Sequence, residues 1–484
     1  MLLSALVFLP VLGALLIALA PGRSTKIIAG AVTLLDLALV VPLWLGFDAS
    51  STAVQHVVRL PWVPAFNIYY YLGVDGLSLP FVFLTSLLGF LAVIVSASIN
   101  HRVKLYFSMV LLLESGVLGV FTALDFALFF LFWEVELLPM YLLISIWGSP
   151  PPLGRREYSA MKFLIYTILG SAFMLLGMLA LHASTGSFDL IQMTHVDLSH
   201  TVIPAHLIFG LIFVAFAVKL PIVPLHTWLP DAHTDAPTAA SVLLAGVMLK
   251  MGGYGILRIC LSLFPESAKL FAPALVGLAV LGVLYGAFIT LQQRDLKRLV
   301  AYSSVSHMGY VLLGFGALGQ AGLTGATLQM FTHGTITGLL FAAVGLVYDK
   351  AHTRQIPELG GLAARMPFVA VSFIIAGLAS LGLPTMSGFV AEFLIFVGTF
   401  PVYGIATSLA AAGIVLTAGY ILWTVERAFF QALPHHLAHV GDATLLERVP
   451  LVALVITIMV VGIVPSVLTD VIKVGLAPIL GRFG

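Results

Sequence analysis

The chain has 484 residues and a formal net charge of +1 at pH 7, with 60% hydrophobic and only 9% charged residues. This charge balance excludes a nucleic-acid partner, and the single cysteine, Cys260, excludes a disulfide framework. The composition is that of a membrane protein with little room for a water-soluble domain.

Apolar stretches of about 20 residues, the length that a helix needs to cross a bilayer, recur along the chain. They predict an all-α protein with fourteen transmembrane helices, centred near residues 11, 37, 88, 115, 136, 170, 215, 250, 281, 308, 336, 383, 415 and 461. Because the loops are short, we expect a single polytopic membrane domain over residues 1–484. Helices 1–3 lie in 1–100, two repeats in 105–263 and 271–430, and helix 14 in 449–475.

The distribution of Lys and Arg predicts the orientation of these helices. The loops after the odd-numbered helices, with their flanks, carry fifteen of these residues, whereas the other side carries five: Arg59, Arg258, Lys269, Lys473 and Arg482. Cytoplasmic loops are enriched in Lys and Arg. Both termini are therefore expected on the outer side of the membrane.

Several ionisable residues fall inside the predicted helices. A charge at the centre of a bilayer costs about 2.5 to 3.5 kcal/mol on insertion scales, so these side chains must be paired, hydrated or neutral. They are expected to face the protein interior or a water-filled cavity. The set comprises Lys219, Lys250, Asp36, Glu114, Glu134, Glu136, Glu392, His307 and His333.

Prolines predict that two of the helices are broken. Pro221 and Pro224 directly follow Lys219, and Pro384 precedes Glu392. Proline removes a backbone donor and clashes with the preceding turn, and broken helices inside a membrane are tolerated where they line a cavity or pack in protein. A matching pair of breaks is typical of inverted repeats around a transport path.

A weak internal similarity fits two repeats made of helices 4–8 and 9–13. "AGVMLKMGGY" (245–254) resembles "AGIVLTAGY" (412–420), which sets Lys250 opposite Thr417. Chance similarity between apolar helices is common, so from periodicity alone the repeat and a chance match stay equally open.

Four segments carry a resemblance to a known family. They read "FWEVELLPMYLLISIWG", "HTWLPDAHTDAPTAASVLLAGVMLKMGGYGILR", "AYSSVSHMGYVLLG" and "GFVAEFLIF". They resemble chain M of bacterial NADH:quinone oxidoreductase (respiratory complex I), the counterpart of mitochondrial NADH dehydrogenase subunit 4, and the resemblance covers nearly the whole chain. The wider superfamily includes two sister antiporter-like subunits of complex I and the large subunits of Mrp-type sodium/proton antiporters. Those relatives usually have a lysine where this chain has Glu392, which favours chain M.

This resemblance implies a subunit of the complex I membrane arm in the bacterial cytoplasmic (inner) membrane. It implies fourteen helices, two inverted five-helix repeats with helices 7 and 12 broken, and one proton channel driven by NADH oxidation and quinone reduction elsewhere in the complex. The expected partners are the other membrane-arm subunits, including the two sister subunits. FMN, the iron–sulfur clusters and quinone are expected in partner subunits, and no cofactor is expected in this chain.

The resemblance also implies roles for individual residues. Glu134 matches the acid that pairs with the helix 7 lysine, here Lys219. Lys250 matches the central relay lysine, and Glu392 matches the terminal acid towards the outside. His307 and His333 match histidines between those last two. The resemblance assigns no role to Glu136, Glu114 or Asp36.

The residue types agree with such a relay. A buried lysine beside a carboxylate can be tuned to bind or release a proton near neutral pH, and histidine titrates there without tuning. The alternative for one Lys/Glu pair is a purely structural role, and a buried histidine is often a satisfied hydrogen-bonding residue. The chain has no CxxC motif and no Gly-rich dinucleotide loop after a strand, which predicts that electrons travel in other chains.

The motif "PDAHTDAP" contains further polar residues. We interpret His226, Asp231 and His233 as helix-capping and proton-entry residues at a cytoplasmic turn. Together with Asp235 they could also suggest a metal site, an interpretation that their position disfavours, so no metal is expected. Two other classes remain for the whole chain, a cation/proton antiporter of the Mrp type and a secondary transporter of an organic solute.

Overall fold

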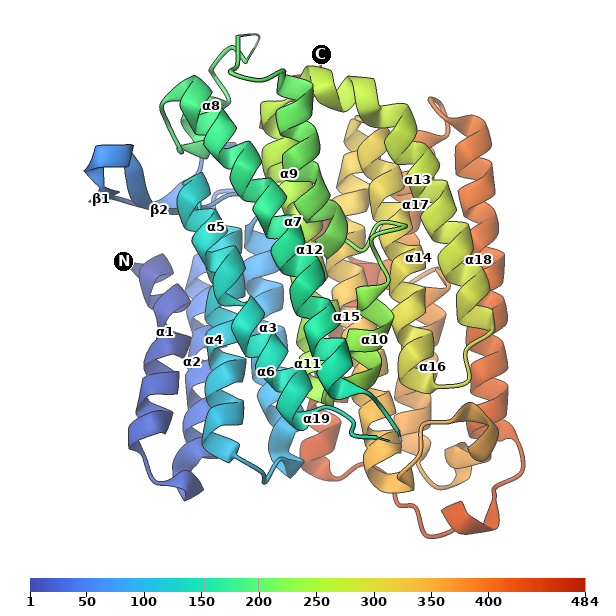
Figure 1. Ribbon diagram of the computed structural model, residues 1–484. Helices are drawn as coiled ribbons and strands as arrows, with labels where there is room; N and C mark the ends of the chain where they lie inside the picture. The colour runs from blue at the N-terminus through green and yellow to red at the C-terminus, as the bar shows by residue number, and fades with distance from the viewer. Residues whose placement is uncertain (152, 199, 484) are drawn as a thin grey trace.

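The computed structural model describes residues 1–151, 153–198 and 200–483. The molecule is a bundle of long helices that run roughly parallel to one another (Figure 1). Eleven described helices are long and apolar enough to cross a membrane, and three shorter apolar helices accompany them. The helices are α1 (Leu2–Leu19), α2 (Thr25–Leu45), α3 (Leu79–Val95), α4 (Val103–Thr122), α5 (Phe126–Val135), α6 (Leu137–Trp147), α7 (Arg156–Thr185), α8 (Leu190–Met193), α9 (Ala205–Lys219), α10 (Trp228–Asp235), α11 (Thr238–Leu243), α12 (Leu249–Gly255), α13 (Pro265–Leu291), α14 (Leu296–Gly316), α15 (Gln320–Ala351), α16 (Pro367–Ser380), α17 (Ser387–Thr399), α18 (Gly404–Val425), α19 (Leu445–Ile463) and α20 (Ser466–Leu480).

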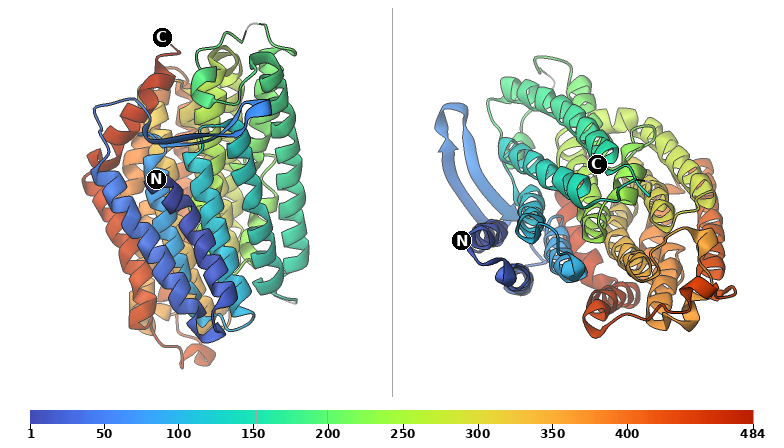
Figure 2. Two further views of the ribbon diagram at one scale, coloured as in Figure 1. Left: turned by 90° about the vertical axis from the view of Figure 1, so that its left-hand side faces the viewer. Right: turned by 60° about the horizontal axis from the view of Figure 1, so that its bottom comes forward.

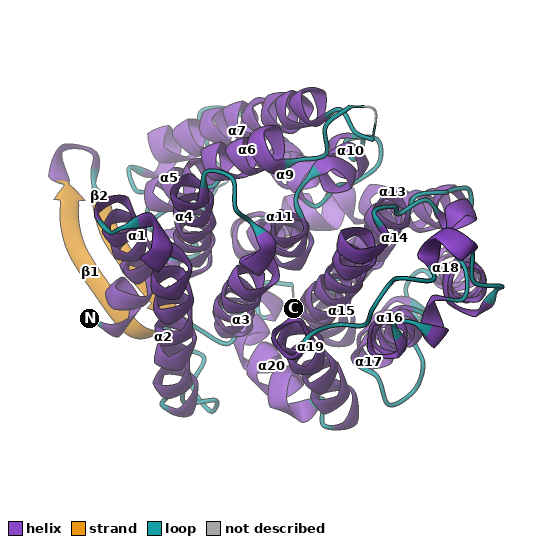
Figure 3. Ribbon diagram, turned by 90° about the horizontal axis from the view of Figure 1, so that it is seen from below, coloured by secondary structure: helices purple, strands orange, loops and turns teal. Residues whose placement is uncertain are grey.

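Burial separates central helices from lipid-facing ones. The apolar window within Thr238–Leu261 is 100% buried and that of α15 is 94% buried, whereas that of α19 is 28% buried. Viewed along the bundle, α3, α11 and α15 lie in the middle, between α1 and α2 at one end and α16 to α18 at the other (Figure 3). Apolar side chains that remain exposed on the outer helices face the position of lipid. The ionisable residues of the central helices are thereby kept from lipid.

One part of the chain is not helical. β1 (Gln55–Val63) and β2 (Ile68–Val74) form an antiparallel hairpin that pairs Leu60 with Tyr70. The hairpin extends across one end of the bundle, beside α1 (Figure 2). The sequence analysis predicted an all-α protein and contained no strand here. We call this end of the bundle the hairpin face, and the opposite end the Arg354 face.

The breaks expected at the prolines are present. α9 ends at Lys219 and the next helix begins at Trp228, so Pro221 and Pro224 lie in non-helical chain. α16 ends at Ser380 and α17 begins at Ser387, with Pro384 between them.

Two further interruptions were not expected. Glu136 separates α5 from α6, and Pro465 separates α19 from α20, so residues 449–475 belong to two helices and not to one. A proline accompanies each interruption. Pro465 stands in the break itself. Pro139 lies in the first turn of α6, where proline is tolerated. A count of apolar windows merges such neighbouring helices.

The helix that carries Lys250 has wide turns on both sides of this residue. Two π-helical segments, η4 (Leu244–Met248) and η5 (Ile256–Leu261), flank α12. π-helical turns are rare and occur frequently at functional sites. The Ala245 carbonyl, in the first of these segments, accepts a hydrogen bond from the Lys250 ammonium.

Candidate functional site

Lys219 forms a buried ion pair, but not with the residue that the resemblance implied. Its ammonium group contacts the carboxylate of Glu136, and both side chains are inaccessible to solvent. The Lys219 Nζ atom also lies 5.3 Å from the ring centroid of Trp133 and 5.6 Å from that of Phe163, at distances typical of cation–π contacts. The predicted Glu134–Lys219 pair is therefore wrong for this structure, and Glu136 is the acid on Lys219.

Glu134 occupies a different environment two residues earlier. It is half-buried, and its Oε1 atom has no hydrogen-bond partner among the described residues. Its side chain lines an apolar cavity of about 750 Å³ between the hairpin and α4 to α7, together with residues such as Trp62 and Phe130. The two acids lie two residues apart in helical backbone, so their side chains point in different directions.

Lys250 is fully buried and contacts His333 directly. Its Nζ atom lies 2.7 Å from His333 Nδ1 and also donates to the Ala245 carbonyl. A protonated lysine is a donor only. His333 therefore accepts on Nδ1 and carries its own proton on Nε2, which has no other partner among the described residues.

The line of titratable groups continues from His333 to Glu392. The rings of His333 and His307 have centroids 5.7 Å apart. His307 Nδ1 lies 3.5 Å from Glu392 Oε1, and its Nε2 lies 2.9 Å from the Ser380 hydroxyl. A cavity of about 10 Å³ lies between the two histidines and Glu392, close to the smallest space that holds one water molecule.

The break between α16 and α17 makes room for the last carboxylate. Gly382 has a φ of +76°, which favours glycine, and a Cβ atom there would lie 2.7 Å from Glu392 Oε2. Glu392 thus lies on the first turns of α17 with its carboxylate against the non-helical segment that contains Pro384.

The helices that carry Lys219 and Lys250 pack closely against each other. Gly252, two residues after Lys250, lies against α9, and a Cβ atom there would lie 2.8 Å from the Phe216 carbonyl oxygen and 3.1 Å from Lys219 Cβ. A glycine at this position lets the two helices approach closely. The helix that carries Lys250 therefore packs directly on α9, which carries Lys219.

The three residues interpreted as proton-entry groups lie apart from one another. His226 is buried against the ring of Tyr285, at 5.1 Å between centroids. Asp231 is partly exposed and pairs with Lys162 at 2.8 Å and with Arg298 at 3.5 Å.

His233 is the one nearest the line of buried groups. It is fully buried, stacks on Phe341 at 4.7 Å, and neither ring nitrogen has a partner among the described residues. It also lies within electrostatic reach of both Lys250 and Lys297.

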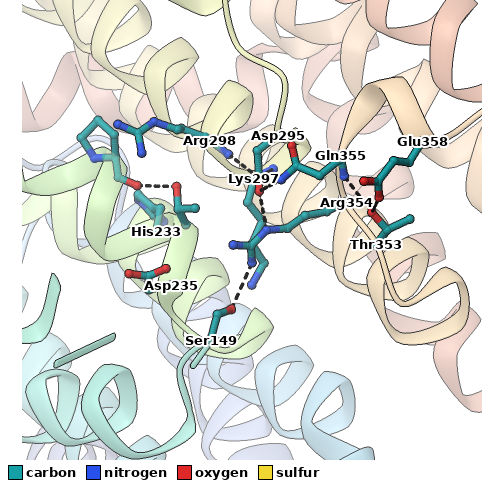
Figure 4. Close-up of polar contacts among 12 residues, drawn as sticks. Ser149, His233, Asp235, Asp295, Lys297, Arg298, Thr353, Arg354, Gln355 and Glu358 are labelled. Atoms are coloured by element: carbon teal, nitrogen blue, oxygen red, sulfur yellow. Dashed lines mark hydrogen bonds and ion pairs between the residues drawn. The ribbon is translucent and has the colours of Figure 1, made fainter. Parts of the chain in front are cut away.

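A polar network on the Arg354 face joins segments from both halves of the chain (Figure 4). Arg354 is fully buried, and its guanidinium donates to Asp295 Oδ2 at 2.5 Å and to the Ser149 hydroxyl at 3.1 Å. Lys297 donates to the Ala236 carbonyl at 2.7 Å. The start of α14 is thereby tied to the loop after α6 and to the end of α10.

A cavity of about 200 Å³ lies beside this network. Ser149, Thr238, Lys297 and Asp349 are among the residues that line it. A polar cavity of this size holds several water molecules. Sequence patterns did not indicate the network or the cavity, because their residues come from loops far apart in the chain.

Asp36 and Glu114 form a separate pair of buried acids in the first helices. Asp36 accepts a hydrogen bond of 2.6 Å from the Ser86 hydroxyl, whereas neither oxygen of Glu114 has a partner among the described residues. Both lie away from the line from Lys219 to Glu392. Within the described ranges, no cluster of three or more His, Cys, Asp or Glu residues could hold a metal ion.

Comparison with known proteins identifies the class of the chain. The model of the family described as "NADH:quinone oxidoreductase/Mrp antiporter, TM" matches residues 123–417. This part of the chain contains Lys219, Lys250, His333, His307 and Glu392. A chain named NADH-quinone oxidoreductase subunit M from Rhodobacter capsulatus is 40% identical over 100% of this chain and 97% of its own length. NAD(P)H-quinone oxidoreductase chain 4 1 from Synechococcus elongatus is 43% identical over 98% of this chain and 90% of its own length.

Solved structures agree with this assignment. A chain of respiratory complex I from Thermus thermophilus with bound NADH superposes with a TM-score of 0.91 at 28% identity, over 100% of both chains. A chain of the Mrp complex from Dietzia gives a TM-score of 0.86 at 22% identity over 100% of both chains, which indicates a shared fold. This chain belongs to the family of NADH:quinone oxidoreductase subunit M, also named chain 4.

Proposed function

We propose that this chain is the proton-translocating, antiporter-like membrane subunit of an NADH:quinone oxidoreductase. It moves protons across the membrane while NADH oxidation and quinone reduction take place in partner subunits that hold FMN, iron–sulfur clusters and quinone. The observation that carries the proposal is the buried line Lys250, His333, His307 and Glu392 in the middle of the bundle, with one gap of 5.7 Å between the two histidine rings. Its partners are the other membrane-arm subunits, including two sister antiporter-like subunits.

Proton transfer along the line begins at Lys250. The Lys250 ammonium gives a proton to His333 Nδ1 across the 2.7 Å contact, and His333 releases its Nε2 proton towards His307. The distance of 5.7 Å between the rings requires one water molecule or a ring rotation, and the small cavity lies at this step. His307 Nδ1 then passes a proton to the carboxylate of Glu392.

The Glu136–Lys219 pair controls the loading of Lys250. While the pair is closed, the charges of Lys219 and Glu136 largely cancel in the neighbourhood of Lys250. When the pair opens, a positive charge at Lys219 repels a proton on Lys250 and drives it towards His333, because charges in a membrane interior interact strongly. Glu134 adds a second carboxyl group at this end of the line, facing the apolar cavity beside the hairpin.

The distribution of Lys and Arg favours the Arg354 face as the cytoplasmic side and the hairpin face, with both termini, as the outer side. Protons enter through the polar cavity beside Lys297 and reach Lys250 by way of His233. His226, buried against Tyr285, and Asp231, partly exposed beside Lys162, are further proton-entry residues on this route. Glu392 releases the proton to the outside.

An Mrp-type cation/proton antiporter is the second candidate function, because it shares the fold and the name of the family model. Glu392 favours the first candidate, since a lysine is the usual residue at this position in the sister subunits and in Mrp antiporters. A transporter of an organic solute would need a pocket with varied polar groups along the relay, where the described cavity has a volume of about 10 Å³.

Two measurements test the proposed function. Mass spectrometry of the detergent-extracted native complex should find this chain with flavin- and iron–sulfur-containing subunits, whereas a small complex of Mrp-like chains would contradict the proposal. NADH-driven acidification of vesicles that contain the purified complex should be lost in Lys250→Met. Normal acidification by that variant, with assembly verified, would exclude the relay.

A further inference from the structure

The face of the helix that carries Lys250 continues towards the hairpin face with two more polar residues. Tyr254 and Arg258 follow Lys250 at intervals of four residues, which puts the three side chains on one side of the helix. The Arg258 Nε atom donates to the Tyr254 hydroxyl at 3.1 Å, so these two are in contact. A path along this face from Lys250 to the hairpin face passes Tyr254 first and Arg258 second.

Tyr254 closes this path with a cluster of aromatic rings from three helices. Its ring lies 5.3 Å from Phe121 of α4 and 6.3 Å from Phe81 of α3, edge to face in both contacts. The rings of Phe81 and Phe121 stack on each other at 5.2 Å. All three side chains are fully buried. Close-packed aromatic rings leave no room for a water chain.

The hydroxyl group of Tyr254 does not offer a free site to a proton. It donates to the Phe121 carbonyl at 3.2 Å and accepts from Arg258 at 3.1 Å. A proton that moved along a hydrogen-bonded chain would need a donor and an acceptor free to change roles, and Arg258 cannot release its proton in a usable pH range.

Arg258 adds a fixed positive charge beyond the rings. Its Nη2 atom donates to both carboxylate oxygens of Asp75, at 2.7 and 2.6 Å. Asp75 in turn accepts from the backbone amides of Leu77 and Ser78, at 3.0 Å each, at the start of α3. The guanidinium is therefore held in place, and an immobile arginine in a narrow path is a barrier to protons and cations.

The two sides of Lys250 differ strongly. Towards the Arg354 face lies a polar cavity of about 200 Å³, and towards the hairpin face lie the aromatic rings and the Asp75–Arg258 pair. We propose that Tyr254, Arg258 and Asp75, the outer seal, close the direct route from Lys250 to the hairpin face, so that a proton on Lys250 leaves through His333. This inference rests on the proposed relay. It adds the residues that leave His333 as the only exit for a proton on Lys250.

The test measures passive proton flux through the assembled complex in liposomes, with quinone reduction blocked by an inhibitor. A potassium diffusion potential drives protons, and an entrapped pH dye reports them. Tyr254→Ala removes the ring, and we expect the flux to rise at least about fivefold because a water-sized gap opens at the seal. Tyr254→Phe keeps the ring and should stay within about twofold of wild type. Arg258→Gln removes the fixed charge and should also raise the flux. It replaces Tyr254→Ala as the test if the complex with Tyr254→Ala does not assemble.

Phe373→Ala is the matched control. Phe373 is also fully buried against an aromatic ring, that of Phe429 at 5.0 Å between centroids, but it lies on α16 and lines none of the cavities described above. Its removal should leave the flux unchanged.

The double variant Tyr254→Ala/Lys250→Met separates this inference from the relay. If the seal guards Lys250, loss of the lysine suppresses the added flux. The inference is overturned if Tyr254→Ala and Arg258→Gln leak no more than Phe373→Ala, or if the added flux persists without Lys250. NADH-driven pumping by Lys250→Met alone reports on the relay, so failure of the relay is recognised independently of the leak.

Discussion

Replacement of Lys250 by arginine distinguishes a proton carrier from a fixed charge. Reference pKa values are about 10.4 for lysine and about 12.5 to 13.8 for arginine, so arginine in water is deprotonated roughly a hundred to a few thousand times less often at a given pH. The site adds a separate structural cost, because it offers Lys250 two acceptors, the Ala245 carbonyl and His333 Nδ1, whereas a guanidinium has five N–H donors to satisfy. Each unsatisfied buried donor costs about 1 to 3 kcal/mol.

We therefore expect Lys250→Arg to lower NADH-driven acidification of vesicles below about a tenth of the wild-type rate, because the relay cannot turn over without proton release. Assembly is verified by NADH oxidation with a soluble electron acceptor. Lys350→Arg is the control, since Lys350 pairs with Glu447 at 3.0 Å and needs only its charge. Wild-type pumping by Lys250→Arg would refute the relay and leave Lys250 with a structural role.

Three further variants test other parts of the structure. Glu136→Gln leaves Lys219 without its counter-charge in a fully buried site, and because breaking a buried pair costs about 3 to 5 kcal/mol, pumping should fall at least about tenfold; an unchanged rate in the acidification assay would contradict this role of the pair. Glu392→Gln should also lower pumping, and Glu392→Lys, which restores a titratable group, should retain more activity than the glutamine variant in the same assay. Arg354→Met breaks the buried pair with Asp295 and should lower the midpoint of thermal unfolding, while an unchanged midpoint would show that the network contributes little to stability.

The outline of the fold followed from elementary properties of the sequence. Apolar length located the long helices, and the missing backbone donors of Pro221 and Pro224 located the break after Lys219. The same properties could not locate the hairpin, whose strands lack a regular alternation, or separate α19 from α20, because apolar composition continues across Pro465.

The identity of the acid on Lys219 shows where reasoning by pattern stops. In one continuous helix, Glu134 and Glu136 would lie on roughly opposite sides, so the choice of one acid excludes the other. In the structure it is Glu136, in the turn between Val135 and Leu137, that points towards Lys219. Neither composition nor motif spacing shows which of the two sides of this helix faces Lys219. The order Lys250, His333, His307, Glu392 also depends on the packing of α12, α14, α15 and α17, which no local pattern encodes.

The contact of Gly252 with the helix of Lys219 has a consequence for mutational tolerance. A methyl group at this position would lie 2.7 Å from the Leu220 amide nitrogen and 2.8 Å from the Phe216 carbonyl oxygen, and neither backbone atom can move without displacing Lys219. The close approach of the helices that carry Lys219 and Lys250 thus depends on the absence of a side chain at Gly252. In a saturation-mutagenesis screen for respiratory growth, Gly252 should be as intolerant as Lys219 itself, although it has no group that binds a proton.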